Sequence, residues 1–172
     1  MKFTYLVTIA VVTLSGCVTN QVMPIAVSEG DAWSGRYRLT WMEGPAAKDG
    51  ASDEVFSITR TPDADPDKVV EKRRADLARW TLSPDEVEVG ELRRFLPDEY
   101  NKEWGWASLY ATGGIECLGA ESHFFVCRVK PGTTVVFGHE GPNQEKILAR
   151  TGLFGSVLHA GGFELTKLDS PP

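Results

Sequence analysis

The chain has 172 residues, of which 42% are hydrophobic and 24% are charged, as in ordinary globular domains. A chain of this length buries enough apolar surface to fold alone, so we expect one folded domain and no cofactor. Its 24 Asp and Glu residues exceed its 18 Lys and Arg residues, giving a net charge of −6. This charge argues against a nucleic-acid-binding protein, because such proteins need a basic surface to replace phosphate counterions.

The first residues predict an export signal. Lys2 supplies a positive charge, and residues 3–14 form a mostly apolar run. As a helix this run would reach about 18 Å, well short of the roughly 30 Å hydrocarbon core of a bilayer. A secretory signal peptide therefore fits this segment better than a permanent transmembrane helix.

The apolar run ends in Leu-Ser-Gly-Cys at residues 14–17, which closely resembles the lipobox of bacterial lipoproteins. The resemblance implies cleavage after Gly16, a diacylglycerol on the Cys17 sulfur and an acyl chain, such as palmitate, on its amine. Two or more acyl chains hold a protein firmly at a membrane. Val18, in place of Asp, implies transport to the outer membrane, with the domain facing the periplasm. The alternative is a plain secreted protein with an incidental cysteine.

Composition divides the rest of the chain into three further parts. After the signal peptide (residues 1–16), residues 17–32 lack sustained periodicity and predict a lipidated tether. Residues 33–169 predict a single globular domain, and residues 170–172 a short tail. The 17 Gly and 10 Pro residues favour short strands and many turns over a helix bundle.

Cys117 and Cys127 remain once Cys17 is lipidated, and an even number of cysteines in an exported domain indicates a disulfide. Polar residues 119–123 separate two apolar runs, and a hairpin there would place the two cysteines opposite each other. The alternative is a nucleophilic or metal-binding thiol. That chemistry needs a nearby base or further ligands, and His123 alone supplies neither constellation.

The first predicted elements are two strands and two helices. Residues 36–41 alternate polar and apolar, with Tyr37, Leu39 and Trp41 inward, and residues 54–60 form the second strand, with Phe56 and Ile58 on one face. A turn-rich loop at residues 43–53 joins them. Asp65 before Pro66 predicts a helix to about Arg79. A Ser-to-Glu capping box at residues 83–86 predicts a second helix over residues 87–96, although its Val-Glu-Val run and glycine leave a strand open.

The second half of the chain is predicted to be mainly β-structure with short connections, which favour antiparallel pairing. Strands are expected at residues 106–110, 115–118, 124–129, 133–137, 153–159 and 163–168, with a helical turn at 146–150 and a hairpin around Gly161 and Gly162. We predict an α+β fold: a curved antiparallel sheet of about six to eight strands with one or two inserted helices. The sequence leaves open whether this sheet closes into a barrel.

Candidate catalytic residues are sparse, and we assign no catalytic residue and no metal ligand. His123, His139 and His159 are scattered, and His139 lacks the second histidine of a zinc-binding helix. Nucleotide-binding glycine motifs and a serine-hydrolase elbow are absent from the sequence. A glycosidase needs two carboxylates that face each other across a cleft, and linear spacing does not show such a pair. The candidate carboxylates are Asp31, Glu43, Glu116, Glu121 and Glu140.

Aromatic residues are the more suggestive feature. Trp104 and Trp106 would share one face of the strand predicted at residues 106–110, and we predict a recognition surface there with Trp104 the more exposed. Trp33 and Gly35 faintly resemble the opening of lipocalin-type barrels, although that family carries these residues in the order Gly-x-Trp. The competing interpretation places one tryptophan of the 104–106 pair in the core and the other as a lid over it.

These observations support three hypotheses of function. The first is a lipid-anchored, non-catalytic module that binds an envelope protein, for example an inhibitor or immunity protein against a cell-wall-active enzyme. Its acidic charge would speed association with a basic partner. The second is a lipocalin-like carrier or sensor of a small apolar ligand inside the curved sheet. The third is a cell-wall hydrolase with a carboxylate pair that the sequence does not reveal.

Overall fold

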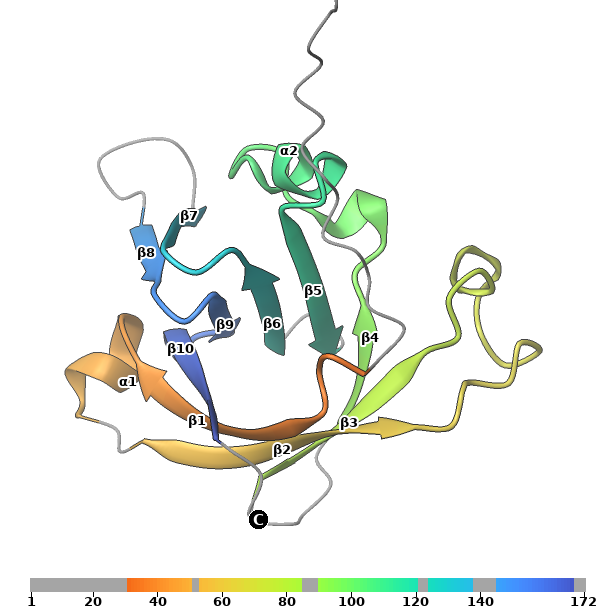
Figure 1. The fold of residues 1–172 in the computed structure, drawn as a ribbon, viewed down its shortest axis with the longest axis horizontal. Coiled ribbons are helices and arrows are strands. Elements are labelled where there is room, and N and C mark those ends of the chain that lie inside the picture. The colour runs from red at the N-terminus through yellow and green to blue at the C-terminus, as the bar shows by residue number, and fades with distance from the viewer. Residues whose placement is uncertain (1–30, 51–52, 85–89, 121–123, 138–144, 169–172) are drawn as a thin grey trace, which may run out of the picture.

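The structure of the chain is a computed structural model that describes residues 31–50, 53–84, 90–120, 124–137 and 145–168. Eight strands close an antiparallel barrel in the order β1-β10-β9-β6-β5-β4-β3-β2, and two further strands form a separate hairpin (Figure 1). The expected α+β fold, an antiparallel sheet of about six to eight strands with one or two helices, is confirmed, and the sheet closes. Closure leaves no open edge on the barrel, where another chain would pair.

The elements follow one another along the chain with mostly short connections. The barrel strands are β1 (Gly35–Trp41), β2 (Glu54–Thr61), β3 (Arg79–Pro84), β4 (Gly90–Arg94), β5 (Ile115–Ala120), β6 (Phe124–Val129), β9 (Leu153–Val157) and β10 (Gly161–Leu168). The hairpin strands are β7 (Thr133–Phe137) and β8 (Glu145–Ala149). The helices are α1 (Gly44–Lys48), α2 (Trp106–Ala111) and the 3₁₀ helices η1 (Glu71–Arg73) and η2 (Pro97–Glu99).

The sheet closes because β1 pairs with both β10 and β2. Tyr37 lies opposite Lys167 on one side and opposite Phe56 on the other. Alternate residues of each strand point into the barrel, so the period-two pattern of the sequence defines the interior. The inward positions predicted for β1 and β2 are confirmed, since Tyr37, Leu39, Phe56 and Ile58 are buried.

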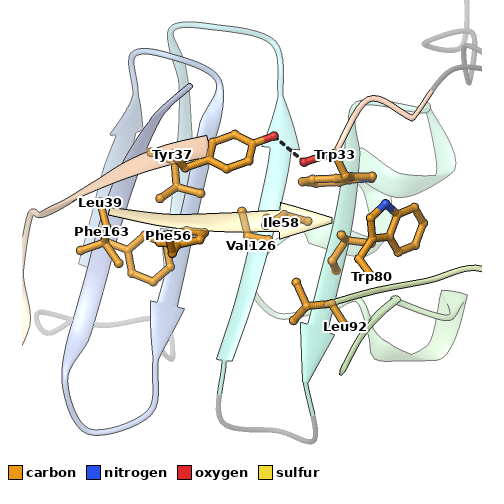
Figure 2. Packing of buried hydrophobic residues seen from close by; sticks show 11 residues of the cluster. Trp33, Tyr37, Leu39, Phe56, Ile58, Trp80, Leu92, Val126 and Phe163 are labelled. Atoms are coloured by element: carbon orange, nitrogen blue, oxygen red, sulfur yellow. Dashed lines mark hydrogen bonds between the residues drawn. The ribbon is translucent and has the colours of Figure 1, made fainter. Parts of the chain in front are cut away.

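Two hydrophobic clusters use the two faces of the barrel wall. The inner cluster includes Trp33 and Trp80 at one end and Leu39 and Phe163 at the other (Figure 2). The second cluster packs the opposite face of β5, β6 and β9 against α2 and the β7–β8 hairpin. Strand β5 contributes to both clusters. Its consecutive residues Cys117 and Leu118 point to opposite faces and belong to different clusters, and both are fully buried.

The helix predicted from Asp65 to Arg79 is wrong. Asp65 Oδ1 does accept a hydrogen bond from Asp67 N–H at 3.0 Å, but the helix does not propagate, and only η1 forms within the segment. Val70, an apolar residue of this segment, is 64% exposed. Trp80 is instead an inward residue of β3, where pairing with β2 and β4 satisfies the backbone. Burial of this indole in the barrel outweighs the local helix signals.

The expected helix over residues 87–96 is also wrong where the structure describes it, because residues 90–94 form β4 and so follow the alternative that was left open. Residues 85–89 lie outside the described part. The strand predicted at 106–110 is the helix α2, which begins after Gly105 at φ 76°. The helical turn predicted at 146–150 is strand β8, and the loop at 43–53 contains α1.

Residues 1–30 lie outside the described part of the chain, so the signal peptide, lipidation at Cys17 and most of the tether stay predictions. Among the described residues, no helix is both long and apolar enough to cross a bilayer.

Candidate functional site

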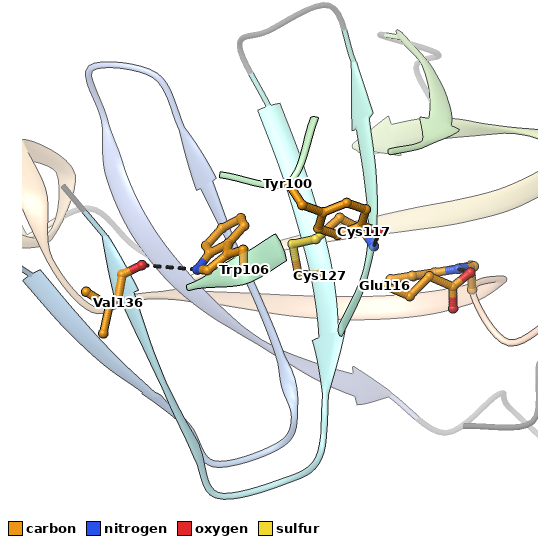
Figure 3. Close-up of a disulfide and its surroundings, with 7 residues drawn as sticks. Tyr100, Trp106, Glu116, Cys117, Cys127 and Val136 are labelled. Carbon is orange, nitrogen blue, oxygen red and sulfur yellow. Dashed lines mark hydrogen bonds between the residues drawn. A yellow bond between two sulfur atoms is a disulfide. The ribbon is translucent and has the colours of Figure 1, made fainter. Parts of the chain in front are cut away.

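The predicted disulfide between Cys117 and Cys127 is present, and it joins directly opposed residues of β5 and β6 (Figure 3). Both cysteines are fully buried in the second cluster. The backbone N–H of Cys117 donates to the hydroxyl of Tyr100 at 3.1 Å. The disulfide therefore also lies against the segment from η2 to α2, which contains Tyr100 and covers this side of the barrel.

Charged side chains gather at the end of the barrel that contains Trp33 and Trp80. Arg94 lies two residues after the inward Leu92, and Arg128 two residues after the inward Val126, so both project to the same interior face at the strand ends. The guanidinium of Arg94 lies 4.9 Å from the Trp80 ring centroid, and that of Arg128 lies 5.5 Å from the Trp33 ring centroid. These are cation–π distances. We call Trp33, Trp80, Arg94, Arg128 and Glu116 the Trp-Arg cap.

Glu116 joins the two arginines of the Trp-Arg cap. It accepts from Arg94 Nε at 3.0 Å and from Arg128 Nη2 at 2.7 Å. Arg94 Nη1 also donates to Asp76 at 3.1 Å. Burial lowers the pKa of Arg94, but hydrogen bonds and charges from Asp76 and Glu116 outweigh burial and raise it above its ordinary value. The network holds two positive and two negative charges in fixed positions.

The tryptophans of the Trp-Arg cap are fixed by Asp31. Its Oδ1 accepts from Trp80 Nε1 at 2.9 Å and from the backbone N–H of Trp33 at 3.2 Å. Burial raises the pKa of Asp31, but the hydrogen bonds from Ser34 and both tryptophans outweigh burial. The pKa of Asp31 is therefore below its ordinary value. The Tyr37 hydroxyl donates to the Trp33 carbonyl at 2.6 Å (Figure 2).

A cavity of about 630 Å³ lies between the Trp-Arg cap and the segment that carries η2 and α2. Its lining combines four charged residues with a larger apolar group. The charged residues are Asp76, Arg94, Glu116 and Arg128; the others are Phe95, Leu96, Pro97, Tyr100, Tyr110, Ala111, Gly113 and Ile115. Ligand sites in proteins share this combination of apolar walls and a few convergent polar groups.

Aromatic rings form one wall of this cavity. The rings of Tyr100 and Tyr110 stack with centroids 4.3 Å apart and an interplanar angle of 19°, and Phe95 meets Tyr100 edge-on at 5.6 Å. Tyr100 is 2% exposed whereas Tyr110 is 38% exposed. Burial raises the pKa of Tyr100 far above its ordinary value, which keeps its hydroxyl neutral. The buried Tyr100 thus supports Tyr110 as an accessible ring.

Trp104 and Trp106 lie in the second cluster and do not line the cavity. Trp106 is buried, and its Nε1 donates to the Val136 carbonyl at 3.1 Å (Figure 3). Trp104 is half-buried, with its ring 5.3 Å from Trp106 and 5.7 Å from Phe137. Trp104 is the more exposed of the two, as expected, but they do not share a strand face. A recognition role for either residue stays a prediction.

The other candidate residues are dispersed. Glu43 hydrogen-bonds Glu145, and burial followed by the charge of Glu145 raises the pKa of Glu43 to about 7. His159 occupies a turn with φ 65°. Outside the described residues lie Glu121, Glu140, His123 and His139. Within the described part of the chain, no three metal-binding side chains come together.

Sequence reasoning named Glu116 but missed its partners. The hairpin predicted at residues 119–123 contains the signal, since a register that pairs Cys117 with Cys127 also pairs Glu116 with Arg128. Arg94 and Tyr110 were hidden because their segments were assigned to the wrong kind of element. Asp76 was hidden for the same reason, inside the helix predicted from Asp65.

Comparisons with protein-family models, curated proteins and solved structures found no match to this chain.

Proposed function

We propose that this protein is a lipid-anchored, non-catalytic binding protein of the bacterial envelope, and that it takes a small, mainly apolar ligand in the cavity beside the Trp-Arg cap. The cavity itself is the observation that carries the proposal. Its volume of about 630 Å³ falls within the range of roughly 300–1,000 Å³ of small-molecule sites. The lipobox-like residues 14–17 support the anchor.

The cavity lies next to the Trp-Arg cap at the end of the barrel, whereas the carrier hypothesis had expected the ligand inside the barrel. Large side chains of the inner cluster occupy the barrel interior. The inward Gly155 illustrates how full it is, because a Cβ there would lie 2.4 Å from the Phe163 ring. The cavity beside the Trp-Arg cap, rather than the barrel interior, therefore offers space for a ligand.

Ion pairing of the cavity carboxylates favours binding over hydrolysis. Asp76 and Glu116 both line the cavity, and both accept hydrogen bonds from Arg94. A glycoside hydrolase needs one carboxyl group that delivers a proton to the leaving group. In this cavity both carboxylates are already held in ion pairs by Arg94.

Binding of an envelope protein stays a prediction, because the described residues form no specific surface that supports it. The large apolar side chains most exposed in the described chain lie on separate elements: Val70, Tyr110, Leu148 and Leu158. Of these, Tyr110 belongs to the cavity.

A matched pair of α2 variants tests the proposal. Ala111 lines the cavity, whereas Ser108 is exposed on the same helix and does not line it. We expect the fluorescence of the neutral naphthalene dye prodan to rise with the full-length protein purified in detergent. Ala111→Trp should fill the cavity and abolish the rise, and Ser108→Trp should retain it. An equal response of all three proteins would contradict the proposal.

A further inference from the structure

The chemistry of the cavity walls restricts the kind of ligand. Tyr100 covers one face of the Tyr110 ring at 4.3 Å, so the exposed part of Tyr110 is directed away from Tyr100. Phe95 braces Tyr100 from the side. Aromatic rings prefer stacked or edge-on contacts with other rings. A planar aromatic ligand would therefore extend the stack that Tyr100 and Tyr110 begin.

The polar wall carries no excess charge. Its two arginines, Arg94 and Arg128, are balanced by Asp76 and Glu116, and three ion pairs at 2.7–3.1 Å join the four residues. An anionic ligand would have to compete with a carboxylate for an arginine, and a cationic ligand would have to compete with an arginine. Burying a charge without a partner is unfavourable. The wall therefore discriminates against both charges.

Two further ion pairs involve the residues that directly follow Pro97 of the lining. Arg73 pairs with Glu99 at 2.7 Å, and Lys72 pairs with Asp98 at 3.4 Å, both between the η1 region and η2.

We propose that the ligand is an uncharged, planar aromatic molecule with a hydroxyl or carbonyl oxygen at one end. Its ring lies against Tyr110, and its oxygen faces the guanidinium groups of the Trp-Arg cap. Arg94 donates to its carboxylate partners through Nε and Nη1, and its Nη2 is the donor that we assign to the ligand oxygen. This inference rests on the proposed function and specifies its ligand class.

Four probes of nearly equal size test the ligand class by calorimetry with the full-length protein. They are 2-naphthol, 2-methylnaphthalene, 2-naphthoate and decahydro-2-naphthol. We expect 2-naphthol to bind at least tenfold more tightly than the anionic 2-naphthoate. It should also bind more tightly than 2-methylnaphthalene, which is more apolar but lacks the oxygen. The saturated alcohol should bind about tenfold more weakly, because it lacks the flat ring.

Substitution of Tyr110 tests the stacking contact separately. Tyr110→Leu keeps an apolar side chain but removes the ring, and should lower the affinity for 2-naphthol about tenfold. Affinity for decahydro-2-naphthol should change much less. Tyr110→Phe keeps the ring and should retain binding, and the melting temperature shows that each variant is folded.

The outcomes distinguish the ligand class from the proposed function. Tighter binding of 2-naphthoate, of 2-methylnaphthalene or of the saturated alcohol, each abolished by Ala111→Trp, would overturn the ligand class and leave the cavity as a binding site. Equal losses of both alcohols in Tyr110→Leu would overturn the stacking contact. Probe binding that Ala111→Trp does not change would overturn the proposed function as well.

Discussion

Two glutamates each bridge two arginines, and they differ in how much they are exposed to water. Their comparison shows how burial changes the contribution of an ion pair to stability. Glu116 joins Arg94 and Arg128 in the Trp-Arg cap, and its side chain is 20% exposed. Glu91 joins Arg79 and Arg93 on the barrel surface, and its side chain is 40% exposed. Water screens the second bridge more than the first.

We expect Glu116→Gln to lower the free energy of unfolding by about 2 kcal/mol, because partly buried Arg128 loses its carboxylate partner and Arg94 retains only Asp76. The matched Glu91→Gln should cost less than about 1 kcal/mol, since exposed ion pairs contribute little. Urea unfolding of both variants measures the difference. Equal losses would show that the Trp-Arg cap is no more tightly coupled than a surface ion pair.

The pair formed by Glu43 and Glu145 predicts a pH dependence of stability. Burial and the charge of Glu145 raise the pKa of Glu43 to about 7 from its ordinary 4.5, so the folded protein retains a proton that the unfolded chain loses. Stability is therefore greatest below about pH 4.5 for this group and falls as the pH rises to about 7. The expected loss is on the order of 1 kcal/mol, because a half-exposed group is screened by water.

Melting temperatures between pH 4.5 and pH 8 check this sign. Glu43→Gln cannot titrate and should flatten the decline over that range. Glu91→Gln is the control, because burial raises the pKa of Glu91 but hydrogen bonds from Arg79 and Arg93 outweigh it and lower the pKa. A decline of equal size in wild type and Glu43→Gln would contradict the assignment.

At the scale of elements, the β5–β6 hairpin was the most predictable part of the fold. Strand β6 has the bounds expected from sequence, and the disulfide lies at the expected register. The polar turn, the alternating apolar residues and the symmetric cysteines that predict this hairpin all lie within one short segment of the sequence. By contrast, α2 was predicted as a strand, because Trp106 and Leu109 are apolar enough for either structure, and their partners come from distant segments.

Removing the disulfide tests how far it stabilises this hairpin. The double variant Cys117→Ala and Cys127→Ala should lower the free energy of unfolding by about 2–4 kcal/mol, because the bond restricts the unfolded chain. Equilibrium unfolding in urea gives the value. In the wild-type protein, alkylation after denaturation without a reducing agent should find no free thiol at either position, because both cysteines are buried in the native fold and become accessible only when it unfolds. Two alkylated thiols would contradict the bond.

At the scale of the whole molecule, the anchor and the barrel are separate features of one chain. The resemblance at residues 14–17 predicts lipidation on the Cys17 sulfur, because the thioether forms on that atom. Cys17→Ser should therefore abolish incorporation of a fatty-acid analogue and leave unprocessed precursor. Metabolic labelling followed by gel analysis measures both. A Cys17→Ser protein that still labels and matures would contradict the lipoprotein assignment.

The sequence by itself determined the antiparallel β-architecture, the inward faces of β1 and β2 and the disulfide, because alternation, turns and cysteine spacing are local properties. Tertiary structure decided the rest. Pairing of β1 with β10 closes the barrel, and packing of Trp80 in its interior outweighs the helix signals after Asp65. The cavity unites Asp76, Arg94, Tyr110 and Arg128, which are far apart along the chain. No local sequence pattern predicts that these residues lie together. They do so only once the barrel has closed and the η2–α2 segment has packed against the barrel.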